Sequence, residues 1–393
     1  MSRFLFVVPP LVGHINPAVG VAAELTARGH RVAWACADPG LVLRLAGGKA
    51  VVFSCDGPVP GAGDGVRPPE IRGPEALKFL WERFLAPLAE AMAPGVAAAV
   101  REFGPDVVVA DQQALAGGLV AERLGVPWAT SATTSAEFTD VLAGMPKVAD
   151  WIDGVLRGLR ARMGDPSGTA DPRFSPQLVL AFSIREFVGP DARTGEQIRY
   201  VGPSITERPG PADFPWDWLD ASRATVLVTL GTANTDVGPR FLAECHRAVR
   251  SRADRMQAVI VDPAGALAGA DDKDVLIVRS VPQLPLLERV DAVVCHAGHN
   301  TVCEALWHGV PLVVAPIRDD QPVVAGQVVE AGAGIRVRFG RVTAVKLGEA
   351  LDAVLHEPGY RAAAERMRSG FRAAGGATAA ASRLEELVAE EAS

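Results

Sequence analysis

Between residues 291 and 321, two short apolar runs are each followed by a group of polar residues. These polar positions, with one glycine among them, are His296, Gly298, Asn300, Thr301, Asp320 and Gln321. The pattern predicts a strand, a tight turn, a helix and a second strand that ends in a polar loop. Backbone N–H groups at the start of a helix have no partner inside the helix and can bind an anion. The acid and amide after the second strand can bind sugar hydroxyls, so the segment predicts adjacent diphosphate and sugar sites.

Two further polar residues, His14 and Asp111, follow apolar runs in the first half of the chain. A neutral imidazole, whose ordinary pKa is near 6.5, can remove a proton from a hydroxyl at cellular pH. A carboxylate on the other ring nitrogen fixes the tautomer and stabilises the imidazolium. The alternative interpretations are a histidine that caps a helix starting near Pro17 and an aspartate that caps the next helix.

Four motifs in the second half of the chain resemble the donor-binding signature of the UDP-glycosyltransferase family, which has the GT-B fold. They occur in the family's order as SVPQ (280–283), HAGHNTVCE (296–304), HGVP (308–311) and DQ (320–321). The first motif differs at Ser280, where the family has a Trp that stacks on uracil. In the first half, GHINP resembles the G-H-x-x-P motif whose His is the catalytic base. Within the family, the chain resembles bacterial enzymes that glycosylate macrolides and similar natural products.

The resemblance implies roles for individual residues. His14 would be the base, and Asp111, in ADQQA, resembles the Asp that orients it. The implied donor site consists of Gly231, Thr232, Val281, Gln283, His296, Gly298, Asn300, Thr301, Glu304, Asp320 and Gln321. In this site Val281 and Gln283 frame the nucleobase, and Glu304 binds the ribose. A carboxylate suits a diol better than a single hydroxyl, so Glu304 favours UDP over dTDP, although both donors stay open.

Neither a metal nor a cofactor is expected, since the nucleotide sugar is a co-substrate. Residues 272–274 fit the D-x-D pattern of metal-dependent glycosyltransferases, but their charged surroundings are more typical of a solvated turn. The cysteines and histidines between 295 and 308 match no common zinc spacing. A helix macrodipole contributes only about 0.3–2 kcal/mol, so direct hydrogen-bond donors must stabilise most of the charge of the leaving diphosphate.

Strand-like and helix-like runs alternate along the chain, which predicts an α/β protein with parallel sheets covered by helices. The strand-like runs are 4–8, 31–36, 106–110, 126–130, 225–230, 258–261, 275–278, 292–295 and 311–315. A stretch rich in Pro and Gly interrupts them. We therefore predict an acceptor-binding domain (1–204), a linker (205–222) and a donor-binding domain (223–393), both Rossmann-like, with their sheets facing across a cleft. The last helix often crosses back to the first domain in the resembling family. Ligands bind at the carboxyl ends of such strands, where the polar clusters fall.

Length and composition limit the functional classes. The 393 residues suit two domains of ordinary size, and a net charge of −7 with scattered cations argues against nucleic-acid binding. The five cysteines are odd in number and mostly lie in apolar runs, which fits free thiols in a reducing cytoplasm. Prolines cut short the first apolar run, which favours a strand over a signal peptide. We expect no stretch long enough to span a membrane.

These observations predict an inverting, metal-independent glycosyltransferase that transfers a sugar from a UDP- or dTDP-sugar to a hydroxyl of an apolar small molecule. An apolar stripe within 75–92, or the region from 133 to Trp151, could line the acceptor site. A homodimer is compatible with the sequence. The alternatives are a nucleotide-sugar epimerase on the same fold and a catalytically silent homologue that activates a partner transferase. A dinucleotide oxidoreductase is disfavoured because no G-x-G-x-x-G follows the first strand.

Overall fold

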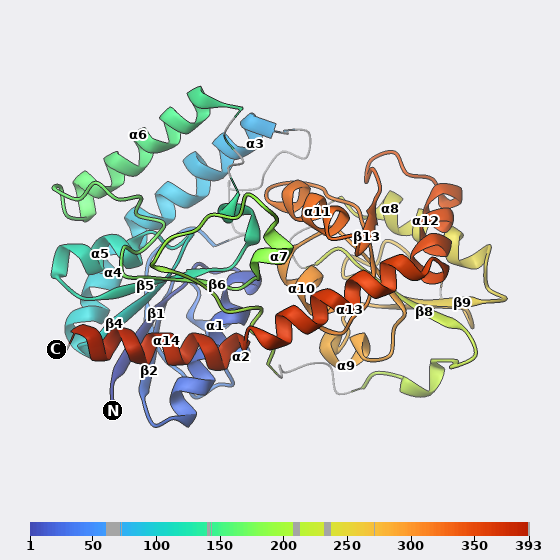
Figure 1. Ribbon diagram of the computed structural model, residues 1–393, viewed down its shortest axis with the longest axis horizontal. Coiled ribbons are helices and arrows are strands. Elements are labelled where there is room, and N and C mark those ends of the chain that lie inside the picture. The colour runs from blue at the N-terminus through green and yellow to red at the C-terminus, as the bar shows by residue number, and fades with distance from the viewer. Residues whose placement is uncertain are drawn as a thin grey trace. The chain divides into compact units, whose positions relative to one another are not determined.

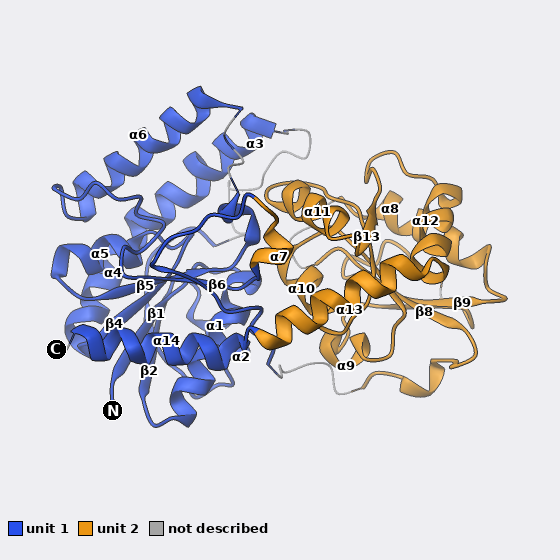
Figure 2. Ribbon diagram, in the orientation of Figure 1, with its two compact units in different colours: residues 1–184, 191–206, 374–393 blue, residues 185–190, 207–373 orange. Residues whose placement is uncertain are grey.

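The chain forms two compact units, which are coloured separately in Figure 2. A computed structural model describes residues 1–59, 71, 73–139, 142, 144–206, 213–231, 237–270 and 272–391. The first unit contains residues 1–184, 191–206 and 374–393, and the second contains residues 185–190 and 207–373. Neither unit is one continuous stretch of chain. Within the predicted linker, residues 207–212 lie outside the described residues.

The first unit is built on a parallel sheet of seven strands in the order β3-β2-β1-β4-β5-β6-β7. Its strands are β1 (Arg3–Val7), β2 (Arg31–Cys36), β3 (Val51–Ser54), β4 (Val107–Asp111), β5 (Trp128–Ala132), β6 (Leu178–Ala181) and β7 (Ile198–Tyr200). Its main helices are α1 (Val12–Ala27), α2 (Pro39–Leu45), α3 (Gly73–Leu80), α4 (Ala86–Phe103), α5 (Ala116–Leu124), α6 (Pro146–Met163) and α14 (Gly376–Glu391). Central strands such as β4 and β5 are fully buried, as expected for a parallel sheet covered on both faces.

Alternate residues of the central strands face two different cores, because side chains alternate across a strand. Phe4 and Phe6 pack in one core with residues of α1 and α14. Leu5 and Val7 pack in a second core with residues of α4 and α5. The sheet is therefore sandwiched between helices, and its carboxyl edge is left for the turns and helix starts that carry His14 and its neighbours.

The last helix, α14, belongs to the first unit, where it packs against α1 (Figures 1 and 2). Leu384 and Leu387 are buried in the same core as the first strand. Glu385 accepts hydrogen bonds from Arg28 at 2.6 Å and from His30 at 2.9 Å. Apolar burial and ion pairs thus both hold this helix on the amino-terminal part of the chain.

The second unit is built on a parallel sheet of six strands in the order β10-β9-β8-β11-β12-β13. Its strands are β8 (Ala224–Thr229), β9 (Met256–Val261), β10 (Val275–Val278), β11 (Ala292–Cys295), β12 (Leu312–Val314) and β13 (Gly334–Arg336). Its helices are α7 (Arg185–Val188), α8 (Pro239–Arg250), α9 (Gln283–Leu287), α10 (His299–Trp307), α11 (Gln321–Glu330), α12 (Ala344–His356) and α13 (Pro358–Ala373). The prediction of two Rossmann-like α/β units with parallel sheets is confirmed.

Helix α3, a π-helical turn (Trp81–Leu85) and α4 join into one helix, Gly73–Phe103. By length and composition it is the one helix among the described residues that could cross a membrane, whereas the sequence analysis expected none. In its most apolar stretch, 39% is buried inside the protein. Buried core helices pass the same test of length and composition. Trp81 and Leu85, which belong to the apolar stripe expected near the acceptor, pack with Leu119, Ile152 and Leu156 of α5 and α6. The stripe therefore forms core.

All five cysteines are free and buried. Burial raises the pKa of the Cys36 thiol to about 11 and the pKa of the Cys55 and Cys295 thiols to about 12. Burial also raises the pKa of Cys245 and Cys303. Because the thiolate is the reactive form, these thiols are structural rather than nucleophilic.

Candidate active site

His14 and Asp111 contact one another at the carboxyl edge of the first sheet. Helix α1, which follows β1, carries His14 in its first turn, and Asp111 is the last residue of the neighbouring strand β4. Nδ1 of His14 lies 2.9 Å from Oδ1 and 3.0 Å from Oδ2 of Asp111. The Asp111 side chain is fully buried, whereas 16% of the His14 side chain is exposed. The Nδ1 edge of the imidazole therefore contacts a buried carboxylate, and part of the ring remains exposed.

Helix capping does not describe these two side chains. Helix α1 begins at Val12, upstream of Pro17, so His14 lies inside the helix rather than at its cap. Asp111 lies before the start of α5, and its Oδ1 accepts a hydrogen bond from the Gln113 N–H at 2.8 Å. The aspartate thus closes the turn after β4 and contacts His14 with the same carboxylate.

Thr133, the first residue of a stretch expected to line the acceptor site, is a third member of this group, and no motif had indicated its contact with His14. Its Oγ1 lies 2.8 Å from Nδ1 of His14, and its hydroxyl donates to Oδ2 of Asp111 at 3.2 Å. Thr133 is buried and follows β5, which pairs with β4. A carboxylate accepts hydrogen bonds only, so the Nδ1–H tautomer of His14 is assigned from this partner. Nε2 is then the ring atom that can accept a proton.

We expect Thr133→Val to lower the turnover rate about tenfold or more, the effect of one lost hydrogen bond to a charged group, and to change the pH profile. Loss of the hydroxyl leaves the Asp111 carboxylate, the partner of Nδ1 of His14, with one hydrogen-bond donor fewer. Thr133→Ser should restore both properties. The measurement is the pH dependence of sugar transfer at saturating donor.

Thr130→Val is the matched control for this prediction. The Thr130 hydroxyl is also buried on β5, but it bonds to backbone atoms of Arg173 and Ser175. Its loss should lower the melting temperature and leave the shape of the pH profile unchanged. If both variants shift the profile equally, Thr133 acts only through stability.

At the carboxyl edge of the second sheet, two glycines pack against the imidazole of His296. Gly231 follows β8 with φ of +69°, and a Cβ there would lie 2.7 Å from Cε1 of His296. Gly298 is the N-cap of α10, and a Cβ there would lie 2.3 Å from Nε2 of the same ring. Ala297, between His296 and Gly298, has φ of +64°, which is uncommon for a residue other than glycine. This turn is therefore shaped around the histidine and differs from an ordinary strand-to-helix turn.

The first turn of α10 contains the other two residues predicted to bind the diphosphate. Asn300 is half-buried and Thr301 is buried, and both follow the Gly298 cap. The amides of a first helical turn point away from the helix and carry its positive dipole end. Thr232, predicted to complete this group beside Gly231, lies outside the described residues.

His296 is almost fully buried, and burial lowers its pKa to about 4, although a hydrogen bond with the Thr229 backbone acts in the opposite direction. Its Nδ1 has no hydrogen-bond partner among the described residues. The ring is therefore neutral at pH 7. An anion beside it would favour the protonated form and raise the pKa again.

We expect His296 to make the protein less stable in acid. The unfolded chain binds a proton at His296 below about pH 6.5, whereas the folded chain binds it only near pH 4. Neutral His296 therefore makes its full contribution to the free energy of unfolding above about pH 6.5. This contribution, up to about 3 kcal/mol, is lost as the pH falls to about 4. Urea unfolding across this range should show a weaker pH dependence for His296→Asn than for the wild type. The exposed His356, replaced in the same way, should leave the dependence unchanged.

Glu304 and Gln283 form a hydrogen-bonded pair. Nε2 of Gln283 donates to Oε2 of Glu304 at 2.6 Å, and the Glu304 side chain is buried on α10. Gln283 is the first residue of α9 and comes after Val281, which is half-buried. The two residues predicted for the base and the ribose are thus coupled, and Gln283 orients the carboxylate.

Asp320 and Gln321 lie where β12 leads into α11. Asp320 is the N-cap residue of α11, and Gln321 is its buried first residue. The side-chain carbonyl of Gln321 accepts hydrogen bonds from the N–H groups of Ile317 at 2.9 Å and Arg318 at 3.1 Å. This carbonyl therefore stabilises the loop between β12 and α11, and the NH₂ group of the Gln321 side chain takes no part in these two hydrogen bonds.

Residues 272–274, which fit the D-x-D pattern, form a turn in which both aspartates pair with arginines. Asp272 accepts from the N–H groups of Asp274 and Val275 and pairs with Arg250, and Asp274 pairs with Arg223 at 2.6 Å. Among the described residues, no group of three or more His, Cys, Asp or Glu side chains is arranged to hold a metal ion.

Residues 256–387 match the family described as "Erythromycin biosynthesis protein CIII-like, C-terminal domain". The 4'-demethylrebeccamycin synthase of Lentzea aerocolonigenes is 30% identical over 438 aligned residues, which cover 98% of this chain and 100% of that protein. The demethyllactenocin mycarosyltransferase of Streptomyces fradiae is also 30% identical, over 99% of this chain and 87% of that protein.

The crystal structure of the kitacinnamycin glycosyltransferase has the same fold. Its TM-score is 0.79 at 26% sequence identity, and the match covers 98% of each chain. Because a relative at 30% identity matches along nearly the whole chain and the two-sheet architecture is shared, the chain belongs to the GT-B-fold UDP-glycosyltransferase family, among the bacterial glycosyltransferases of natural products.

Proposed function

We propose that this glycosyltransferase moves a sugar from a nucleoside diphosphate to a hydroxyl of an apolar small molecule, with inversion and without a metal ion. The observation that carries this proposal is the contact of Nδ1 of His14 with Asp111 and Thr133. Such a contact leaves Nε2 to accept a proton. General-base catalysis of this kind contributes about 10²–10⁴-fold.

In the proposed reaction, the acceptor hydroxyl transfers its proton to Nε2 of His14 as its oxygen forms a bond to the anomeric carbon. The bond from this carbon to the diphosphate breaks in the same displacement, and its electron pair leaves with the nucleoside diphosphate. Attack on the face opposite the leaving group inverts the anomeric configuration. The buried Asp111 carboxylate stabilises the imidazolium that forms.

The charge of the leaving diphosphate is assigned to the turn around His296 and the first turn of α10. A macrodipole contributes only about 0.3–2 kcal/mol. Hydrogen bonds to an ionised oxygen are roughly twice as strong as neutral ones. Amide groups of this turn, the neutral His296 ring, Asn300 and Thr301 therefore supply most of the stabilisation. The buried Glu304, oriented by Gln283, is assigned to the ribose, which favours UDP over dTDP.

Asp320→Ala should weaken binding of the nucleotide sugar by about tenfold or more and change binding of the free nucleotide less than twofold. The expected loss is one or two hydrogen bonds to a charged acceptor. Calorimetric titration with the sugar donor and with the nucleotide alone measures the difference. Glu330→Ala, at the other end of α11, is the control. Equal losses for both ligands would place Asp320 away from the sugar.

The experiment that tests the whole proposal is a panel of UDP- and dTDP-sugars against mixed apolar aglycones, read by mass spectrometry with and without EDTA. The expected result is a glycosylated hydroxyl of inverted anomeric configuration, at a rate that EDTA does not change. Loss of activity in EDTA would overturn metal independence. Sugar isomerisation without any acceptor would point to an epimerase. The free, buried cysteines favour a reducing compartment such as the cytoplasm for the reaction.

A further inference from the structure

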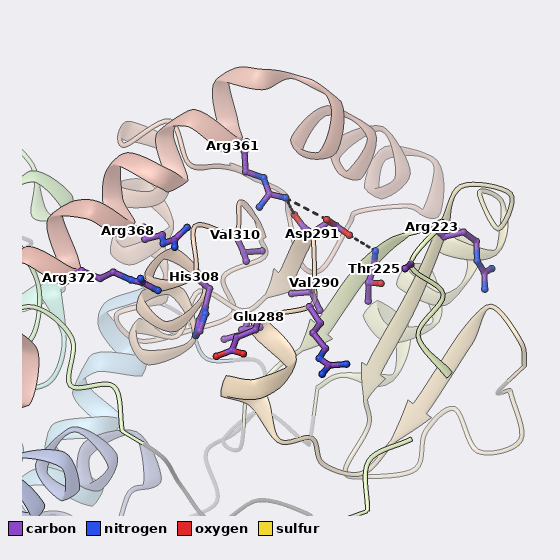
Figure 3. A pocket seen from close by; sticks show the side chains of 13 residues that line it. Arg223, Thr225, Glu288, Val290, Asp291, His308, Val310, Arg361, Arg368 and Arg372 are labelled. Atoms are coloured by element: carbon purple, nitrogen blue, oxygen red, sulfur yellow. Dashed lines mark hydrogen bonds and ion pairs between the residues drawn. The ribbon is translucent and has the colours of Figure 1, made fainter. Parts of the chain in front are cut away.

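A cavity of about 570 Å³ lies at the amino-terminal edge of the second sheet (Figure 3). Thr225, near the start of β8, and Asp291, just before β11, line it. Gly231 and His296 follow the same two strands at their other ends. The cavity is therefore distinct from the site assigned to the donor, and its volume is typical of a site for a small molecule.

The side chains that line the cavity carry a net positive formal charge, although the protein is acidic. Its lining includes the five arginines Arg223, Arg289, Arg361, Arg368 and Arg372. Only two acidic residues, Glu288 and Asp291, line it with them, whereas the whole chain has a net charge of −7. A concave surface lined by one sign of charge concentrates counter-ions.

Three of the seven charged side chains that line the cavity form hydrogen bonds or ion pairs that stabilise its wall. Arg361 donates to the carbonyls of Gly309 at 3.1 Å and Asp291 at 3.0 Å. The Asp291 carboxylate accepts from the Thr225 N–H at 2.8 Å. Arg223 pairs with Asp274 at 2.6 Å. These contacts hold the wall in place.

Arg368 and Arg372 are better placed to bind a ligand. They are four residues apart on α13, so they share one face of the helix. Arg368 pairs with Glu365 at 3.0 Å, but both side chains are more than one-third exposed, and such surface pairs contribute little. The central carbon of the Arg372 guanidinium lies over the Trp307 ring, 5.5 Å from its centre, which is a cation–π contact.

His308 lies beside these two arginines (Figure 3). Its Nε2 is buried and has no hydrogen-bond partner among the described residues. Burial lowers the pKa of His308, the charges of Arg372 and Arg368 lower it further, and Glu288 acts in the opposite direction. The ring nitrogen therefore experiences the charge of both guanidinium groups and lacks an acceptor.

We propose that Arg368, Arg372 and His308 form a binding site for a small multivalent oxyanion, either phosphate itself or the phosphate group of a larger metabolite. Two guanidinium groups and one ring N–H match the several acceptor oxygens of such an anion. These three donors from α13 and the end of α10 are neighbours in one part of the cavity wall, which suits a compact anion better than an extended acidic peptide. The site does not depend on the proposed sugar-transfer reaction.

The test is calorimetric titration of the full chain with inorganic pyrophosphate at physiological salt, because salt screens surface attraction. The double variant R368Q/R372Q should bind one equivalent of pyrophosphate fewer than the wild type. The reason is that the affinity of this site for pyrophosphate falls at least about tenfold. Arg366→Gln is the matched control, an exposed arginine on the same helix that does not line the cavity. It should bind as the wild type does. Glu288→Gln removes the opposing charge and should tighten binding.

Several outcomes would overturn the proposal. They are equal stoichiometry for the wild type and the double variant, equal losses for Arg366→Gln, and binding of an acidic peptide but not of pyrophosphate. Parallel titrations with phosphate and a nucleoside diphosphate distinguish free phosphate from a phosphate-bearing metabolite. Melting temperatures of the variants establish that each is folded. Because R368Q/R372Q leaves His14, His296 and Glu304 intact, unchanged sugar transfer in this variant separates the two proposals.

Discussion

Replacing His14 by alanine is expected to lower the rate of sugar transfer about 10²–10⁴-fold, the usual contribution of a positioned general base. The imidazole is the group at this edge of the sheet that combines a buried carboxylate partner with an accessible ring. Without it, the acceptor hydroxyl must lose its proton to water. Initial rates at saturating donor and acceptor, measured from pH 6 to 9 on folded protein, give the size of the effect.

His30→Ala is the matched control for His14→Ala. His30 also lies in the first unit and also contacts a carboxylate, Glu385, at 2.9 Å. Its replacement should affect the packing of α14 and leave the transfer rate within twofold. Donor affinity should stay the same in His14→Ala, because the assigned donor residues lie in the second unit. A wild-type rate in this variant would remove His14 from the role of base.

Asp111→Asn should lower the transfer rate by a similar factor, about 10²–10⁴-fold, although the asparagine has nearly the same size. The amide can present its NH₂ group to Nδ1 of His14, which would favour the tautomer with its proton on Nε2. That tautomer cannot accept the proton of the acceptor. The variant also loses the charge that stabilises the imidazolium. The rate loss should therefore persist at every pH where the wild type is active.

The effect of Asp111→Asn must be separated from a loss of stability, because the carboxylate accepts hydrogen bonds from His14, Thr133 and Gln113. The melting temperature and the affinity for the nucleotide provide this separation. Glu385→Gln changes the carboxylate beside His30 and serves as the control. If more than about nine-tenths of the Asp111→Asn variant is folded and the variant still transfers sugar at the wild-type rate, the role of Asp111 is limited to closing the turn after β4.

Sequence patterns predicted the central strands of both sheets and missed four shorter ones. The missed strands are β3, β6, β7 and β13, each of three or four residues. Val51, at the start of the edge strand β3, is 54% exposed, so its strand carries little apolar signal. β6 is a fully buried run that periodicity alone cannot distinguish from a helical segment. Strand β5 was expected at 126–130 and lies at Trp128–Ala132.

The residues of the candidate site could be predicted where they lie in a short motif, but not where they depend on contacts between distant parts of the chain. His14 and His296 lie in short motifs, so their positions could be identified from neighbouring residues. Thr133 could not, because its contact with His14 depends on the pairing of β4 with β5, which joins residues far apart in sequence. The packing of Gly231 against His296 likewise joins two loops from neighbouring strands. Sequence reasoning therefore indicated the motifs and expected His14 to pair with Asp111, but it missed the contacts that Thr133 and Gly231 make.

The position of α14 has a consequence for biosynthesis. Ala380, Ala381, Leu384 and Leu387 complete the core that also contains Phe4 and Phe6. A ribosome that has translated the first two hundred residues has made every strand of the first sheet, yet the face that α14 covers stays open to water. The core between the sheet, α1 and α14 can therefore form only after residues 376–391 have emerged, whereas the core on the α4 and α5 side of the same sheet needs no residue beyond Trp128.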